Sequence, residues 1–156
     1  MEHFTVIQEN DAKSHPLKFK NVPDSILEPD VNTAYEFYIN PKFESNDLSR
    51  VQLEILFQLS FIPKSTLVEY SKYFTFSFII ENDITLFSKS SYSENVITPL
   101  YNLISPLLTQ IFKYFINQCF EHYSGFNQNV SLPDSEDSSI KIMIKKNLDD
   151  YYSKLQ

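Results

Sequence analysis

Glycine is almost absent from this chain: Gly125 is the single glycine among 156 residues. Loops that bind phosphate groups need glycines so that the backbone can approach the phosphate closely. The two common nucleotide-binding loops are therefore excluded. Tryptophan is missing and arginine occurs once, as Arg50. Neutralising a nucleic-acid backbone requires many Lys and Arg side chains. The formal net charge of −7 therefore argues against a nucleic-acid-binding protein.

Cysteine is equally scarce, with Cys119 as the single thiol. One cysteine forms no internal disulfide and no multi-cysteine metal site. The segment "MEHFTVIQEND" also lacks the basic start and apolar stretch of a signal peptide. We therefore expect a cytoplasmic protein.

Candidate catalytic and metal-binding groups are few. Cys119 and His122 are three residues apart, a spacing that brings a thiol and an imidazole together on a helix. Because nothing nearby supplies an oxyanion hole, we favour a buried structural cysteine. His3 and His15 flank the first predicted strand, and solvated histidines are the more common explanation than a metal site. We expect no metal and no cofactor.

Three glutamates, Glu36, Glu54 and Glu69, fall on the polar positions of three neighbouring predicted strands. They could line up on one face of a sheet. A solvated face explains this pattern better than an acid–base pair does, so we expect a protein that is not an enzyme.

Aromatic residues are abundant, with fourteen Phe and ten Tyr. Apolar residues occupy alternate positions in "RVQLEILFQLSFIP", "TLVEYSKYFTFSFIIEN" and "TAYEFYINPKFES". A period of two is typical of β-strands that are buried on one face. Pro41 inside the third run indicates an edge position, a bulge or a break. With the short run "LKFKNV", the pattern predicts an antiparallel meander of about four strands, with one apolar face and one mixed face.

The pattern changes to a helical spacing between Ser93 and Tyr123, where Ser93 or Asn95 is suited to cap the helix. This long helix is apolar around most of its circumference. We therefore expect one side to cover the sheet and the other to contact a second copy of the protein. Pro106 should bend or break it. A closing C-terminal helix is expected over residues 138–156.

Together these elements predict an α+β fold with a single domain over residues 1–156, in which residues 1–15 form a short strand or a flexible tail. One alternative concerns the segment Val96–Ile116, whose length and single charge approach those of a membrane-spanning helix. Two prolines, several polar residues and the lack of flanking basic clusters argue against it. We favour a helix buried between the sheet and a partner subunit.

Four motifs occur in the order found in the SecB export-chaperone family. "LVEYSKYFTFSFI" (67–79) resembles that family's third long strand, and "VITPLYNLISPLL" (96–108) is similar to the opening of its first helix. "LKFKNVP" (17–23) resembles part of its first strand, and "SLPDSEDSS" (131–139) resembles the link into its last helix. The resemblance extends over roughly residues 17–155.

This resemblance implies a cytoplasmic, ATP-independent holdase that assembles as a homodimer or homotetramer. Such a chaperone binds unfolded or extended polypeptides along apolar grooves, through large aromatic contacts with little sequence preference. We expect client binding by five phenylalanines of the strands: Phe37, Phe43, Phe57, Phe74 and Phe76. On alternating strands, at least half of them could instead belong to the core.

In the SecB family, an apolar residue and a glutamate of the third strand dock on the SecA motor, and Leu67 and Glu69 match those positions. The family's acidic residues on the first strand are replaced by Pro16 and Lys20, which argues against SecA docking. Some relatives serve a toxin–antitoxin pair, and this chain could do so or bind an export substrate. The alternative is a non-enzymatic assembly subunit that binds one fixed protein partner.

Overall fold

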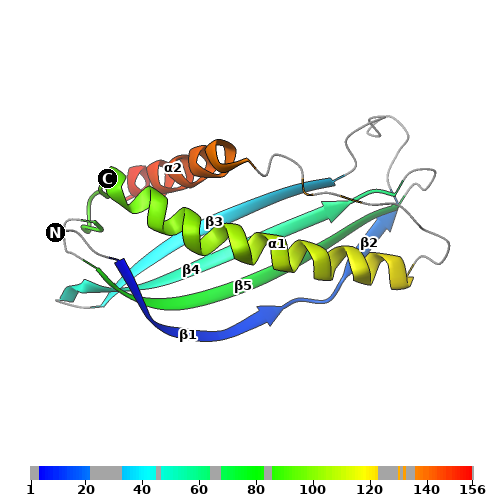
Figure 1. Cartoon of the computed structure of the whole chain (residues 1–156), viewed down its shortest axis with the longest axis horizontal. Coiled ribbons are helices and arrows are strands. Elements are labelled where there is room, and N and C mark those ends of the chain that lie inside the picture. Colours follow the sequence, from blue (N-terminus) through cyan, green and yellow to red (C-terminus); the bar gives the residue numbers. More distant parts are fainter. Residues whose placement is uncertain are drawn as a thin grey trace.

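The computed structural model describes residues 4–21, 33–44, 47–63, 68–82, 86–122, 130, 132 and 136–155. The described chain forms two layers: an antiparallel sheet, and two helices that lie on one face of it (Figure 1). The α+β class, the long helix and the C-terminal helix predicted from the sequence are confirmed.

The sheet has five strands where about four were expected: β1 (Phe4–Ser14), β2 (Lys18–Asn21), β3 (Thr33–Glu44), β4 (Asp47–Phe61) and β5 (Val68–Asn82). Strands β3, β4 and β5 form an antiparallel meander, as predicted for the three long runs. The order of strands across the sheet is β1-β5-β4-β3. β1 and β2 both pair with the remaining edge of β5, one after the other along its length. β3 therefore lies at the other edge of the sheet, which is the edge position that Pro41 indicated.

The helix-covered face of the sheet carries the apolar half of each alternating strand. Phe57 of β4 lies opposite Phe37 of β3 and Phe74 of β5 in the strand register. Its ring also packs edge-on against Phe76, with 5.6 Å between the ring centroids. These aromatic side chains are buried together with the aliphatic residues of the same strands. They form the floor of the core.

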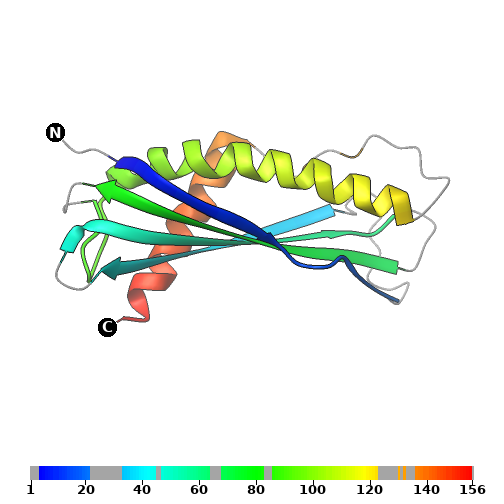
Figure 2. The ribbon, with the colours of Figure 1, turned by 90° about the horizontal axis from the view of Figure 1, so that it is seen from below.

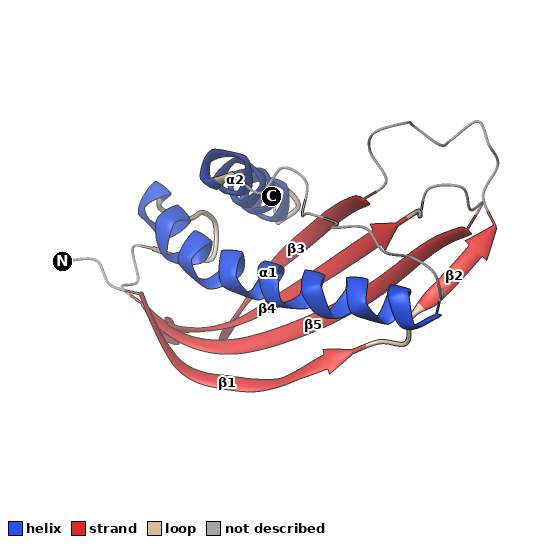
Figure 3. Cartoon of the chain, turned by 45° about the vertical axis from the view of Figure 1, so that its right-hand side comes forward, coloured by secondary structure: helices blue, strands red, loops and turns tan. Residues whose placement is uncertain are grey.

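The long helix α1 (Ile97–His122) follows a short 3-10 turn (Glu94–Val96) and lies along the sheet (Figures 2 and 3). The Ser93 side chain accepts a hydrogen bond from the Asn95 backbone N–H, as predicted for a cap. The predicted break at Pro106 is wrong, because α1 continues through it. Because Pro106 has no N–H, the Asn102 carbonyl has no helical hydrogen-bond donor. Both residues lie on the exposed side of α1, where water can supply the missing hydrogen bond.

The closing helix α2 (Asp137–Ser153) packs near β3 and beside the start of α1. Its buried residues recur every fourth position, as Ile140, Ile144, Leu148 and Tyr152. Two hydroxyl–carboxylate hydrogen bonds tie it to the rest of the chain, from Tyr101 to Asp137 and from Tyr92 to Asp149. None of the helices in the described residues is long and apolar enough to cross a membrane.

Candidate functional site

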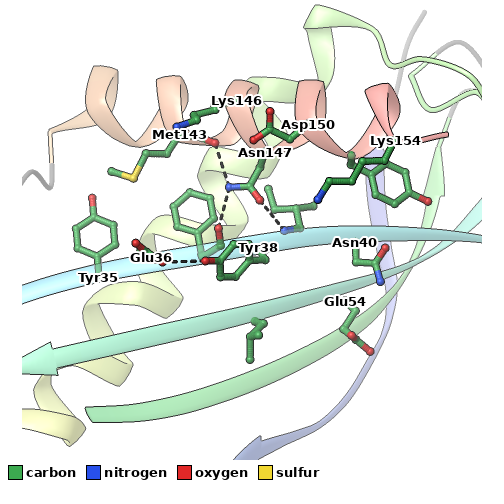
Figure 4. Close-up of a pocket in the computed structure, with 14 residues that line it drawn as sticks. Tyr35, Glu36, Tyr38, Asn40, Glu54, Met143, Lys146, Asn147, Asp150 and Lys154 are labelled. Carbon is green, nitrogen blue, oxygen red and sulfur yellow. Dashed lines mark hydrogen bonds between the residues drawn. The ribbon is translucent and has the colours of Figure 1, made fainter. Parts of the chain in front are cut away.

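A groove of about 560 Å³ runs between the edge of β3 that faces away from β4 and helix α2 (Figure 4). Residues 35–40 of β3 form one wall, with Glu54 and Leu56 of β4 below them. The opposite wall is formed by six α2 side chains: Met143, Lys146, Asn147, Asp150, Tyr151 and Lys154. The volume lies in the range of pockets that bind ligands in proteins.

The strand edge that borders this groove is bonded to side chains of α2. The Asn147 amide donates a hydrogen bond to the Phe37 carbonyl at 2.8 Å and accepts one from the Ile39 N–H at 3.1 Å. The Tyr151 hydroxyl donates to the Pro41 carbonyl at 2.6 Å. Because Pro41 has no N–H to offer at this edge, its place in the outermost strand costs no ladder hydrogen bond. The edge is thus closed by side chains and not by another strand.

Acidic and basic side chains both line the rim of the groove, and two of the acids are bonded to other side chains. Glu54 forms an ion pair with Lys42 at 3.7 Å, and Glu36 accepts a hydrogen bond from the Tyr38 hydroxyl at 2.8 Å. That bond to the Glu36 carboxylate raises the pKa of Tyr38. Burial raises the pKa of Tyr151. Both tyrosines therefore remain neutral hydrogen-bond donors at physiological pH.

The five phenylalanines predicted to bind clients lie mostly in the core. Phe37, Phe57, Phe74 and Phe76 are buried on the helix-covered face of the sheet, and Phe43 is half-buried against the same core. Only Phe37 also lines the groove. Contact between a client and the other buried rings would require α1 or α2 to move away. Their role in client binding stays a prediction.

Glu69, one of the two residues matched to SecA docking, does not line the groove. Glu69 of β5 faces Lys20 of β2 across the strand register, with 3.9 Å between the ammonium nitrogen and the carboxylate. Leu67 falls outside the described residues. The role of both residues in docking stays a prediction.

Cys119 and His122 do not form a reactive pair in this structure. The His122 ring lies at the Tyr70 hydroxyl, 3.2 Å from it, and at the Phe19 ring. Cys119 is only 1% exposed, and burial raises the pKa of its thiol to about 12. A thiol that stays protonated is a poor nucleophile. This agrees with the structural cysteine favoured from the sequence.

We predict that Ellman's reagent labels the Cys119 thiol of the folded protein at pH 8 at least about 1,000-fold more slowly than it labels free glutathione. The reason is that labelling requires opening of the chain. Because the folded pKa lies above that of an exposed thiol, the neutral thiol stabilises the fold at neutral pH. This contribution is lost as the pH rises through about 12.

Labelling in urea supplies the control, since the unfolded chain should react completely. Rapid labelling without denaturant would mean that α1 does not hold its buried face against the sheet.

The α2 wall of the groove was not predicted from the sequence. Met143, Asn147 and Tyr151 are spaced four residues apart and therefore share one face of α2, beside the buried stripe. The presence of Asn147 and Tyr151 in this row is the one feature of the sequence that could have indicated a binding surface. It does not identify the strand that these side chains contact. In the described part of the chain, no cluster of three or more His, Cys, Asp and Glu could hold a metal ion.

Comparison with known proteins finds distant likeness to solved structures. No protein family matches the sequence, and neither does any curated protein. One similar solved structure is a protein of unknown function from Streptococcus agalactiae, with 12% identity and a TM-score of 0.39, covering 85% of this chain and 98% of that one. Another is a Mycobacterium tuberculosis SecB-like chaperone in complex with an antitoxin peptide, with 11% identity and a TM-score of 0.38. That match covers 80% of this chain and 89% of the chaperone.

Proposed function

We propose that this protein is a SecB-like, ATP-independent holdase that binds non-native or extended polypeptides. The observation that supports this most directly is the groove beside β3, where a strand edge, aromatic side chains and the apolar Met143 meet. A sheet edge offers backbone hydrogen bonds to an extended chain that displaces the Asn147 and Tyr151 side chains, and apolar walls add affinity with little sequence preference. These are the properties that holding a non-native chain requires.

The expected clients are a narrow set, such as an antitoxin or an export substrate. The order of SecB-like motifs along the sequence supports this expectation. Docking on SecA is left out of the proposal, because Pro16 and Lys20 stand where the family has acidic residues. The second candidate, a subunit with one fixed partner, would use the same groove with a permanent occupant.

The outward side of α1 supports the further proposal of a homodimer or homotetramer. Exposed residues on this side are almost all uncharged, and Lys113 and Glu121 are the charged ones. The uncharged ones include Thr98, Asn102, Pro106, Thr109, Gln110, Tyr114 and Asn117. Depletion of charge is typical of the centre of protein–protein interfaces. Pairing through α1 would also leave the groove on α2 free for clients.

The test combines light scattering on a size-exclusion column with an aggregation assay. Chemically unfolded citrate synthase is diluted into buffer without nucleotide, with and without the protein. We expect a dimer or tetramer that suppresses light scattering at roughly stoichiometric amounts. A protein without this activity that copurifies with one partner at a fixed ratio would support the assembly-subunit alternative instead.

A further inference from the structure

A second hollow, with a volume of about 390 Å³, lies between α2 and the segment 90–94 that precedes α1. It shares no lining residue with the groove beside β3. Oxygen is the only polar side-chain atom of all its lining residues, which are Ser90, Ser91, Tyr92, Glu94, Asp149, Tyr152 and Ser153. These residues include two carboxylates and no Lys, Arg or His, so the lining is negatively charged. We call this site the oxygen-lined hollow.

The two carboxylates of the oxygen-lined hollow act on the same phenol. The Tyr92 hydroxyl donates a hydrogen bond to Asp149. Burial, this hydrogen bond and the charges of Asp149 and Glu94 raise the pKa of Tyr92. Glu94 also forms an ion pair with Lys145, with 3.2 Å between the ammonium nitrogen and the carboxylate. A carboxylate offers about four acceptor positions, so both groups can accept further hydrogen bonds.

Tyr152 supplies a hydroxyl without a partner. The residue is 4% exposed, and its buried hydroxyl accepts or donates no hydrogen bond within the part of the chain that the structure describes. Such groups are ordinarily bonded, because an unbonded one costs folding free energy. The Tyr152 ring packs against that of Tyr92, with 5.6 Å between the centroids. Burial and the neighbouring phenols of Tyr151 and Tyr92 raise the pKa of Tyr152. The unused hydroxyl therefore lies near the phenol that bonds Asp149.

Negative charge, oxygen acceptors and aromatic rings together favour an ammonium ligand. An ammonium group has three N–H donors and no acceptor, which suits a lining of carboxylates and hydroxyls. Tyrosine rings add attraction for a cation. A calcium ion suits the lining less well, because it takes about six to eight oxygen ligands and binds chiefly through carboxylates and carbonyls. Two carboxylates favour a ligand with more than one ammonium group, since each charged pair makes a strong hydrogen bond.

We propose that the oxygen-lined hollow binds a linear aliphatic amine with two or more ammonium groups, held by Asp149, Glu94 and the Tyr152 hydroxyl. This inference does not depend on the proposed holdase function, because the hollow and the groove share no residue. The walls come from α2 and from the segment before α1, so a bound amine should hold α2 in place and stabilise the fold. The competing explanation is that amines only screen the net charge of −7.

Putrescine, a four-carbon diamine, is the probe that separates the two explanations. We expect isothermal titration calorimetry to show that it binds at least about tenfold more tightly than butylamine, which has the same chain and one ammonium group. Near saturation it should raise the midpoint of thermal unfolding by at least about 4 °C. Butanediol and sodium chloride of equal ionic strength should not reproduce this shift. A larger shift with calcium chloride would overturn the choice of an amine.

Two variants test the residues. Tyr152→Phe removes only the hydroxyl and should weaken putrescine binding about three- to tenfold. Without ligand this variant should unfold at the same or a higher temperature, because an unpartnered buried hydroxyl is gone. Asp149→Asn keeps an acceptor for Tyr92 but loses the charge, and should bind at least about tenfold more weakly. Asp150→Asn makes the same change at a residue that does not line the hollow, so its putrescine binding should be unaltered.

The outcomes also separate this inference from the proposed function. Weaker binding in the Tyr152 and Asp149 variants alone, with citrate synthase aggregation still suppressed, would support the amine site. Equal weakening in the Asp149 and Asp150 variants would indicate charge screening and overturn the site. Unchanged binding in the Tyr152 variant would overturn the role of the hydroxyl, and it tests the proposal even if Asp149→Asn does not fold. An unaltered protein that suppresses aggregation but binds no putrescine would overturn this inference and leave the holdase function standing.

Discussion

Replacing Phe57 by alanine is expected to lower the free energy of unfolding by about 3–5 kcal/mol. The side chain is 0% exposed and contacts the Phe37 and Phe76 rings in the middle of the sheet. Truncation removes these contacts and leaves a cavity that rigid neighbouring strands fill poorly. Urea denaturation followed by circular dichroism measures this change, and the slope with denaturant should remain that of the unaltered protein.

Tyr38→Ala is the matched control, because Tyr38 lies beside Phe37 on β3 but points to the other face and is 50% exposed. Its stability should stay within about 0.5 kcal/mol of the unaltered protein, while suppression of citrate synthase aggregation weakens because Tyr38 lines the groove. The opposite result for Phe57→Ala, unchanged unfolding with loss of aggregation suppression, would contradict its place in the core. Such a result would mean that α1 lifts to admit clients.

The alternating strands were predictable because successive side chains of a strand point to opposite faces of the sheet. A period of two in the apolar residues therefore shows which side chains face the core. Each residue on the apolar positions of β4, from Val51 to Phe61, is buried as the pattern requires. Pro41 indicated an edge position, a bulge or a break for an equally local reason, since a missing N–H is tolerated only where no ladder bond is needed. The structure has the first of these, with Pro41 on the edge strand β3. The cap at Ser93 was readable from the residue itself. In each case one short segment carried the whole signal.

What covers an apolar face cannot be read from that face. A helix, a second subunit and a bound client all require the same phenylalanines, so the sequence could not tell core rings such as Phe74 from client-binding ones. The sharing of β5 by β1 and β2 was hidden for a related reason. Pairing depends on residues far apart in the chain, such as Phe4 with Asn82 and Phe19 with Tyr70.

The groove was the least predictable feature, because it depends on the contact between two distant elements. Asn147 and Ile39 are separated by 108 residues in the sequence. An asparagine on a helix is ordinarily a solvated residue, and nothing in its neighbours indicates a strand edge. Only the docking of α2 through its buried stripe brings the carboxamide to β3. The groove therefore exists only as long as α2 is in place.

Ile144→Asp is expected to remove α2 from the sheet. Ile144 is 0% exposed, and an aspartate at this position would bury a carboxylate among apolar side chains. The cost should be at least about 3 kcal/mol, most of which the chain avoids by releasing the helix into water. Because Asn147 and Tyr151 leave β3 with α2, the variant should no longer suppress the aggregation of citrate synthase. Light scattering of diluted citrate synthase and urea denaturation measure the two effects.

Ile142→Asp is the matched control on the same helix, two positions away, where the side chain is 68% exposed. It should suppress citrate synthase aggregation as the unaltered protein does, and its free energy of unfolding should stay within about 0.5 kcal/mol. Labelling of Cys119 distinguishes local release from general unfolding, because the thiol lies on α1, on the face buried against the sheet. Slow labelling in the Ile144 variant, together with lost aggregation suppression, assigns client binding to the β3–α2 groove. Retained suppression after release of α2 would assign client binding to a surface formed by β-strands or α1.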